Sequence, residues 1–358
     1  MNVIRPIERD DLSALLRIAE LSGPGFTSLP LHPELLEQRI NQSIASLQQA
    51  SGRFDGDHYL FVLEHGETGE VIGTTAIASR VGMQDPWYHY RIGTVVHASR
   101  EMGIHNRFNT LYLCNDYTGH SEVCSLFLDP AYRRDRNGTL LSKCRFLFMA
   151  QFPERFAERV IAEMRGVSND AGDSPFWEGL GRHFFSMEFS EADYLTGLGN
   201  KSFIAELMPK HSIYIHLLPE SAQQVIGEVH RNTRPARKML EDEGFHFEGY
   251  VDIFDAGPTL ICRLNDIRSV SYSEQQRLAK VVKKLPPGQA CLLANTRLQG
   301  YRCILTELPY FPEGKLQLSR IQADALQVEP GDGLRLVPLA LTRKRAAAEP
   351  DSDGSASG

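Results

Sequence analysis

A basic, glycine-containing turn is the feature of this sequence with the clearest chemical potential. The apolar segment Glu122–Leu128 predicts a strand, and Thr139–Gln151, which has no breaker, predicts a helix. Between them lies RRDRNG, which contains Arg133, Arg136 and Gly138. A helix N-terminus offers unpaired N–H groups and a positive dipole end, so this turn suits an anion such as a pyrophosphate. The alternative is an ordinary strand-to-helix turn, because neither a P-loop nor a G-x-G-x-x-G pattern is present.

Histidines and one cysteine are the candidates for acid–base or covalent chemistry. Of twelve histidines, His230 lies just before a predicted helix, where capping alone would explain it. His120 stands directly before the Glu122–Leu128 strand and is its strongest rival. Cys124 lies on that strand, but nothing in the sequence pairs it with a base, and buried cysteines are common. The other rival histidines are His97, His105 and His211.

Composition narrows the class of protein. A chain of 358 residues with 42% hydrophobic content predicts more than one folded domain. The net charge of −7 and the lack of a dominant basic run make nucleic acid a poor partner. The six cysteines form no C-x-x-C pair, so we expect free thiols, no metal and a reducing compartment. The charged N-terminus lacks a signal peptide's apolar core, and no segment is long and apolar enough for a membrane span, so we expect cytoplasm and no membrane.

The elements before the basic turn follow the order β-α-α-β-β. Alternation and helical spacing predict, in order, the segments Asn2–Ile7, Leu12–Leu21, Pro33–Gln49, Tyr59–Glu64 and Val71–Ser79. Ser22–Pro30 is rich in Gly, Pro and Ser and predicts a loop. The aromatic and polar stretch 82–119 predicts further strand and loop.

The remaining elements indicate a second α/β region and a small β-rich module. Predicted strands are Arg159–Gly166, Phe203–Leu207, Ile213–Leu218, Tyr250–Phe254, Thr259–Leu264, Ala290–Ala294, Tyr301–Leu308 and Leu334–Val337. Predicted helices are Ser174–Phe185, Ser221–Val229 and Arg234–Glu243. Two of these helices end near a glycine that closely precedes an aromatic residue, at Gly181 and at Gly244, which suggests two related layers.

The element order and the turn resemble the GNAT-like acyl-CoA N-acyltransferases, an α/β (α+β) fold. In that superfamily the turn binds the CoA pyrophosphate, and the strand before it diverges from its neighbour to pair with the pantetheine arm. The match here is Arg133-x-x-Arg136-x-Gly138. Arg136 replaces the first glycine of the pattern, which puts a side chain where backbone should approach phosphate.

A closer resemblance, running in order from Val3 to Leu264, is to the bacterial arginine N-succinyltransferase family. The matching segments include DPWY, LFLDP, SPFW, FIAELMPKH, IGEVH and DIFDAGPTL. The resemblance implies transfer of succinyl from succinyl-CoA to the α-amine of L-arginine, the first step of arginine degradation by that route. It implies succinyl-CoA as co-substrate, no permanently bound cofactor, a succinyl-CoA contact at Leu126 and a proton donor at His230, although Arg231 follows where the family often has proline.

The two substrates carry charges that the site must meet. A carboxylate should bind the arginine guanidinium, and a basic group should bind the succinyl carboxylate. Candidate carboxylates are Glu122, Glu163, Asp252 and Asp255. Candidate basic residues are Arg91, Lys143 and Arg165.

We expect residues 1–200 to form the GNAT-like acyl-CoA-binding region and 201–279 a second α/β region carrying His230. Residues 280–343 should form the β-rich module, and 344–358 a disordered tail. We expect a homo-oligomer or pairing with a homologous subunit. Two alternatives stay open: a related acyltransferase acting on ornithine or another amine, and a non-catalytic acyl-CoA-binding partner subunit, which Arg136 favours.

Overall fold

The computed structural model describes residues 1–22, 29–49, 52, 54–169, 172–197, 202–312 and 314–340. The tail predicted over 344–358 and most of the loop predicted over Ser22–Pro30 lie outside these residues.

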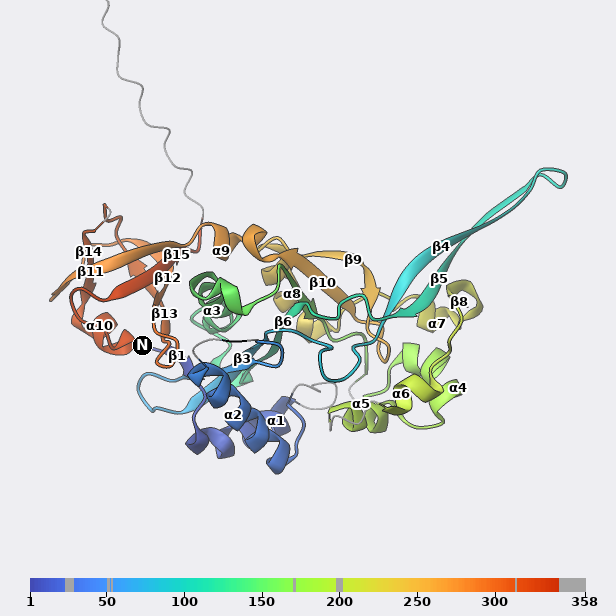
Figure 1. Ribbon diagram of the computed structural model, residues 1–358, viewed down its shortest axis with the longest axis horizontal. Coiled ribbons are helices and arrows are strands. Elements are labelled where there is room, and N and C mark those ends of the chain that lie inside the picture. Colours follow the sequence, from blue (N-terminus) through green and yellow to red (C-terminus); the bar gives the residue numbers. More distant parts are fainter. Residues whose placement is uncertain are drawn as a thin grey trace, which may run out of the picture.

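The described strands form one mixed sheet of fifteen strands (Figure 1). Its order is β14-β11-β15-β12-β13-β1-β2-β3-β6-β7-β10-β9-β4-β5-β8. The strands are β1 Val3–Pro6, β2 His58–Glu64, β3 Val71–Ala78, β4 His89–Ser99, β5 Ile104–Cys114, β6 Ser121–Leu128, β7 Arg159–Glu163, β8 Ile213–Tyr214, β9 His246–Val251, β10 Pro258–Arg263, β11 Glu274–Val282, β12 Gln289–Asn295, β13 Cys303–Leu308, β14 Leu316–Ser319 and β15 Gly333–Pro338.

Helices cover both faces of the sheet. The α-helices are α1 Leu12–Ser22, α2 Pro33–Gln48, α3 Asn137–Gln151, α4 Arg182–Phe185, α5 Phe189–Gly197, α6 Ser202–Leu207, α7 Glu220–Gln223, α8 Arg234–Glu241, α9 Arg268–Ser271 and α10 Arg320–Leu326. A π-helix spans Trp177–Gly181, and a 3₁₀-helix spans Arg231–Thr233.

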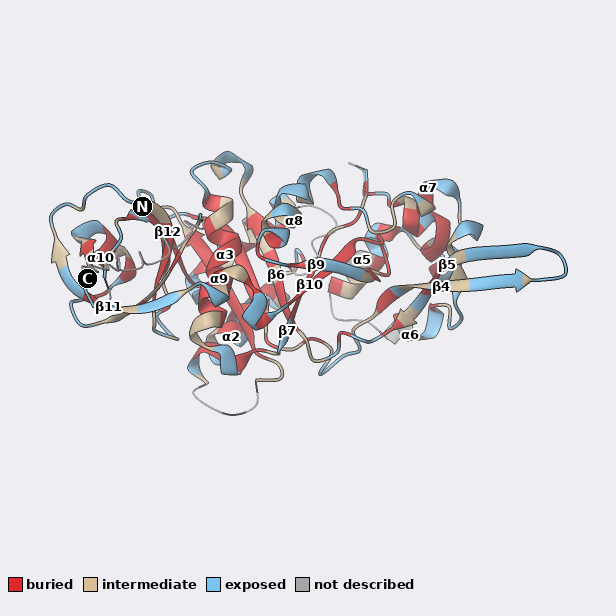
Figure 2. Cartoon of the chain, turned by 90° about the horizontal axis from the view of Figure 1, so that it is seen from above, coloured by how far each residue is buried: buried red, intermediate tan, exposed pale blue. Residues whose placement is uncertain are grey.

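The central helices differ in how far they are enclosed. α1 and α2 bury one apolar stripe against β2 and β3, with Leu15, Ile18 and Leu36 in contact with that face. α3 is buried almost all round from Leu140 to Met149, because it packs against β3 and β6 and also against α9 and the C-terminal strands β12, β13 and β15 (Figure 2). Most of its residues from Leu140 onwards are apolar, as expected of a helix enclosed in a core. This arrangement fixes the turn before α3 rigidly at the end of β6.

A second core lies beyond β7. Trp177 and Phe176 are fully buried and pack with residues of β4, β5 and the segment after β9. β4 and β5 continue from this core as a long hairpin that projects from the body, and its outer half is exposed on both faces (Figure 2). Exposure on both faces explains why the stretch 82–119 shows no apolar alternation.

The C-terminal strands complete the sheet on the side of β1. β13 pairs with β1 at Cys303 and Ile4, and β1 pairs on its other edge with β2. Tyr301 reaches under α3, and its hydroxyl donates a hydrogen bond to the Cys144 carbonyl at 2.9 Å. The first strand of the chain is therefore an interior strand.

The predicted fold class, α/β with a β-rich C-terminal region, is confirmed, but four local predictions were wrong. Of the predicted strand Tyr250–Phe254, only the first two residues are in a strand, at the end of β9. Phe203–Leu207, predicted as a strand, lies in helix α6, because Ile204 and Met208 have i, i+4 spacing and both face the second core. Ile213–Leu218 forms a strand only over its first two residues. The helix predicted over Ser221–Val229 ends at Gln223, and Gly227, with φ of 81°, follows that end.

Candidate active site

β6 and β7 run parallel but soon diverge. They pair only at Ser121 with Val160 and at Glu122 with Ile161. β6 continues to Leu128 while still paired with β3 on its other edge. Beyond Glu122, the backbone groups on the β7 side of β6 therefore have no strand partner among the described residues. An extended ligand with amide groups can pair with such an edge, and this is the divergence that the GNAT-like fold implies.

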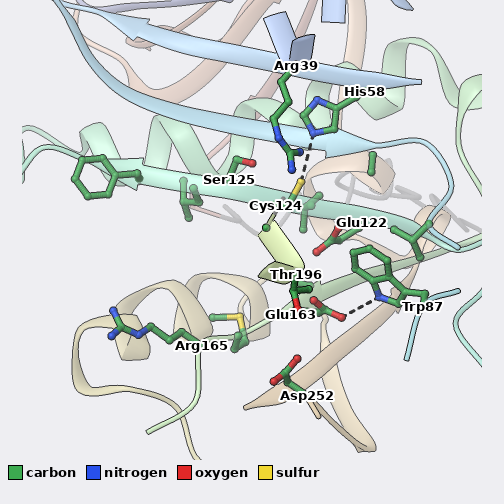
Figure 3. A pocket seen from close by; sticks show the side chains of 18 of the residues that line it. Arg39, His58, Trp87, Glu122, Cys124, Ser125, Glu163, Arg165, Thr196 and Asp252 are labelled. Carbon is green, nitrogen blue, oxygen red and sulfur yellow. Dashed lines mark hydrogen bonds between the residues drawn. The ribbon is translucent and has the colours of Figure 1, made fainter. Parts of the chain in front are cut away.

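A cavity of about 940 Å³ opens at this divergence (Figure 3). Its wall comes from β6, the segment after β7, α2, residues 80–88, residues 252–255 and the start of α8. Binding sites for small molecules and cofactors usually measure roughly 300–1,000 Å³, so the space is sufficient for a large ligand.

β6 carries a bulge where it borders the cavity. Its pairing with β3 shifts between Phe127, opposite Thr74, and Cys124, opposite Ala76. Ser125, within the bulge, has φ of 51°, and its carbonyl accepts a hydrogen bond of 3.0 Å from the Thr74 hydroxyl. Bulges redirect backbone groups next to active sites. The strand thus interrupts its regular ladder at the centre of the cavity wall.

The turn predicted to bind phosphate follows directly. Leu126 and Arg133 both line the cavity, and Arg133 Nε also donates to the Leu128 carbonyl at 3.3 Å. Gly138 lies in the first turn of α3 and does not border the cavity. Arg136 has φ of 59°, a conformation that glycine adopts more easily, but its side chain is exposed and does not border the cavity either. The arginine in the family's glycine position therefore leaves the cavity open.

His230 lies buried beside the cavity wall, with 6% of its surface exposed. Its backbone N–H donates to the Arg165 carbonyl at 2.9 Å, and its Nδ1 accepts from the Asn232 N–H at 3.2 Å. Arg165, Asn232 and Thr233 border the cavity. Because Nδ1 accepts a hydrogen bond, the neutral imidazole carries its proton on Nε2. His230 thus caps the 3₁₀-helix before α8 through Nδ1, while Nε2 carries the ring proton.

The rival histidines lie elsewhere. His97 and His105 are on the projecting β4–β5 hairpin, where His97 contacts the Tyr214 hydroxyl at 2.9 Å. His211 is exposed, and His120 packs against Tyr117. None of the four borders the cavity, and neither does His230 itself, which differs from them in that its hydrogen-bond partners Arg165 and Asn232 line the cavity.

A histidine that the sequence did not indicate, His58, does line the cavity. It extends from β2 towards Cys124, and its Nε2 lies 3.9 Å from the cysteine Sγ (Figure 3). Burial, and secondarily the charge of Arg39, lower the pKa of His58 from 6.5 to about 3. Burial likewise raises the pKa of the Cys124 thiol well above its ordinary value. Both groups are therefore neutral near pH 7, which argues against a thiolate nucleophile.

The four candidate carboxylates all border the cavity. Asp255 is a structural anchor, because its two oxygens accept from the N–H groups of Gly166 at 2.6 Å and Gly257 at 2.8 Å. Glu163 accepts from the Trp87 indole N–H at 2.9 Å, and the same carboxylate oxygen lies 2.7 Å from Nε2 of the buried His89. Burial, and then the charge of Glu163, raise the pKa of Asp252.

Glu163, Asp252 and Trp87 gather near one end of the cavity, with Glu122 on β6 above them (Figure 3). The charge of Glu163 adds to the cost of ionising Asp252, and a bound cation would reduce that cost. An indole ring beside them adds a surface on which a guanidinium can stack. This end is an arrangement suited to a cationic group.

The three candidate basic residues lie in different environments in the structure. Arg165 lines the cavity, and its Nη2 donates to the Ser168 hydroxyl at 3.0 Å. Arg91 is exposed near Asp116. Lys143 is buried in an ion pair of 2.6 Å with Glu243 and does not border the cavity. Of the three, only Arg165 is therefore placed to meet a ligand.

Three arginines that the sequence did not indicate also border the cavity: Arg39 from α2, Arg80 after β3 and Arg145 from α3. Arg145 is 1% exposed and donates to the Ser142 carbonyl at 3.0 Å and the Cys124 carbonyl at 3.5 Å. Burial lowers the pKa of Arg145 to about 10. Helical arginines carry no sequence signal of this kind, since a charged helix residue usually faces solvent.

Among the described residues, no cluster of histidine, cysteine and carboxylate side chains could hold a metal ion. In the described part of the chain, no helix has the length and apolar character needed to cross a bilayer.

Comparisons with known proteins agree along nearly the whole chain. The family model "Arginine N-succinyltransferase beta subunit" matches residues 2–269, and the model of that subunit's C-terminal domain matches residues 277–338. An arginine N-succinyltransferase of Citrobacter koseri is 51% identical over 97% of this chain and 100% of its own length. One from Escherichia coli is 50% identical with the same coverage.

A solved structure shares the fold. Arginine/ornithine succinyltransferase subunit AI from Pseudomonas aeruginosa is 38% identical, with a TM-score of 0.88 over 95% of this chain and 99% of that one. The likeness therefore extends through the C-terminal strands and is not confined to the region around the cavity.

Proposed function

Because this chain belongs to the arginine N-succinyltransferase family and is an acyltransferase, we propose that its cavity binds succinyl-CoA and L-arginine together. The succinyl group then passes to the α-amine of arginine, giving N2-succinyl-L-arginine and CoA. The divergence of β6 from β7 is the observation that carries this assignment, because it exposes backbone groups along one wall of a cavity with opposite charges in it.

The CoA arm is proposed to follow β6. Its pyrophosphate lies at the N-terminus of α3, near Arg133, where the helix dipole and a cation both favour negative charge. Its pantetheine amides pair with the open edge of β6 at Leu126. The thioester then reaches the bulge at Ser125. Gly138 contributes only as a small residue in the first turn of α3.

The acceptor arginine is proposed to enter from the acidic end. Glu163 and Asp252 bind its guanidinium, and Trp87 offers a ring for stacking. Binding the guanidinium there holds the α-amine near the bulge, which converts the attack into an intramolecular step. The amine nitrogen forms a bond to the thioester carbon, and the C–S bond breaks.

His230 is proposed to protonate the departing CoA sulfur through its Nε2–H group. The proton that the attacking nitrogen loses passes to the same ring nitrogen in the same step, so the imidazole stays neutral and the products are an amide and a thiol. The hydrogen bond from Asn232 to Nδ1 supports this role, because it fixes the proton on Nε2.

The substitution His230→Asn separates chemistry from capping. Asparagine is a strong N-cap and can accept from the Asn232 N–H, but it has no titrating proton. We expect kcat to fall by about 10²–10⁴-fold with an unchanged melting temperature and little change in KM. Thiol release from succinyl-CoA with L-arginine measures this. Near-normal turnover in a folded variant would refute the role of His230.

Ornithine is a second candidate acceptor, because the Pseudomonas aeruginosa relative is described as an arginine/ornithine succinyltransferase subunit. A paired carboxylate site suits either cation, but only guanidinium offers a planar fork for bidentate contact. Thiol release with each amine, at equal succinyl-CoA, decides the preference from the two kcat/KM values.

We also propose that the chain assembles with itself or with a homologous chain. The matching family model and the solved relative are both described as subunits. A compartment that keeps thiols reduced, such as the cytoplasm, fits the six cysteines, all of which are free. Light scattering coupled to size exclusion measures the assembly, and a mass of 40.2 kDa would indicate a monomer.

A further inference from the structure

We propose that Arg39 binds the distal carboxylate of the succinyl group and so selects succinyl-CoA over uncharged acyl-CoA donors. This inference rests on the proposed function and assigns a residue to the charge that distinguishes this donor. The site is the part of the cavity between α2 and β6, on the opposite side of Cys124 from the acidic end (Figure 3).

Arg39 is placed to receive a ligand. It extends from α2 into the cavity, with its guanidinium directed towards Ser125 and Cys124 on β6 (Figure 3). Burial lowers its pKa, while the proximity of Cys124 and Glu122 partly offsets this. Within the described ranges, no carboxylate lies within ion-pair distance of it and no hydrogen bond is formed by its side chain. A half-buried guanidinium without a partner is costly, and a bound carboxylate would remove that cost.

Other arginines at this cavity are already engaged. Arg145 donates to the carbonyls of Ser142 and Cys124, and Arg165 to the Ser168 hydroxyl. Arg80 lies 3.6 Å from Asp55. Arg39 therefore differs from its neighbours in offering its donors to the cavity.

The length of the donor agrees with this placement. Two methylene groups separate the succinyl carboxylate from the thioester, which puts the two carbonyl carbons about 4 Å apart when the chain is extended. The carboxylate must therefore bind close to the thioester. Arg39 faces the residues of the β6 bulge, where the thioester is proposed to lie.

The groups around Arg39 suit one carboxylate. His58 is neutral, because burial and the charge of Arg39 lower its pKa to about 3, so it adds no second cation and can accept or donate one hydrogen bond. The buried Ser125 hydroxyl forms no hydrogen bond with a described nitrogen or oxygen atom. Glu122 lies two residues before Cys124, about 7 Å along the strand, on the side where the cationic acceptor enters.

The test compares two donors in two variants. Butyryl-CoA matches succinyl-CoA in chain length but carries a methyl group in place of the carboxylate. We expect Arg39→Met to lower kcat/KM for succinyl-CoA by about 100- to 1,000-fold, because a site built for a polar group discriminates strongly. Turnover of butyryl-CoA should stay within about threefold of wild type, and Arg39→Lys should be intermediate. Arg263→Met, an exposed arginine on β10 outside the cavity, is the matched control and should change neither value.

Equal losses with both donors, or an unchanged preference for succinyl-CoA, would overturn the assignment. If wild type releases no thiol from succinyl-CoA with any amine, the proposed function fails, and calorimetric titration of the two CoA esters then decides the role of Arg39 alone. In that case, a preference for succinyl-CoA that disappears in Arg39→Met supports the site, and equal affinities in wild type refute it.

Discussion

His58 makes a quantitative prediction about stability and pH. The folded protein holds its imidazole with a pKa of about 3, against 6.5 for a solvated histidine in the unfolded chain, because burial and then Arg39 disfavour the charged form. Between these two values the unfolded chain binds a proton that the folded chain does not. By linkage, stability must therefore fall as pH falls from 6.5 towards 3.

The size of the effect follows from the two pKa values. At pH 5 the solution is 1.5 pH units below the pKa of the unfolded imidazole, and each pH unit corresponds to 1.36 kcal/mol. The free energy of unfolding is therefore about 2 kcal/mol lower at pH 5 than at pH 7. At pH 7 the contribution of this group is close to zero. His58→Gln removes the titration and leaves all other groups in place.

Urea unfolding at pH 5, 6, 7 and 8 measures this difference. Carboxylates and other histidines contribute equally to both proteins, so subtracting the two pH profiles isolates His58. We expect wild type to lose about 2 kcal/mol more than His58→Gln between pH 7 and pH 5. Parallel profiles would refute the reasoning, because they would mean that His58 can be protonated in the folded state.

Two further predictions concern buried and lining charges. Glu163→Gln should raise KM for L-arginine by about 10- to 100-fold with kcat little changed, because the amide oxygen can still accept from Trp87 but the negative charge near Asp252 is lost. Steady-state kinetics at saturating succinyl-CoA measures this KM, and an unchanged value would exclude Glu163 from acceptor binding. Lys143→Met should lower the free energy of unfolding in urea by about 3–5 kcal/mol, because it leaves the buried Glu243 carboxylate without its ion-pair partner, while kcat/KM of the folded enzyme stays the same. A loss under about 1 kcal/mol would contradict this interpretation of the pair.

Local sequence patterns correctly predicted the strand and the helix that flank the site. The apolar run at Glu122–Leu128 and the unbroken segment after Gly138 identified β6 and α3, because strands and helices of a core carry strong periodic signals. The bulge at Ser125 was not predictable, since a serine in a left-handed conformation has no sequence mark. The four short elements after residue 201 were predicted incorrectly because their packing partners lie far away in the chain.

The site itself was only partly accessible to sequence reasoning. All four proposed carboxylates border the cavity, but the sequence could not distinguish Asp255, whose oxygens fix a loop, from Glu163 and Asp252. Arg39 and His58 were missed because a helix residue and a strand residue without a motif reveal their direction only in the folded sheet. The roles of Leu126, Arg133, Gly138 and His230 stay predictions until variants are measured.

The position of β1 has a consequence for how the chain is made. β1 pairs on one edge with β2 and on the other with β13, which begins only at Cys303. Until β13 has been synthesised, Ile4 and the residues beside it therefore present an unsatisfied strand edge, the kind of surface through which nascent chains associate with one another. Once they have folded, the C-terminal strands protect this edge of β1 from pairing with another chain.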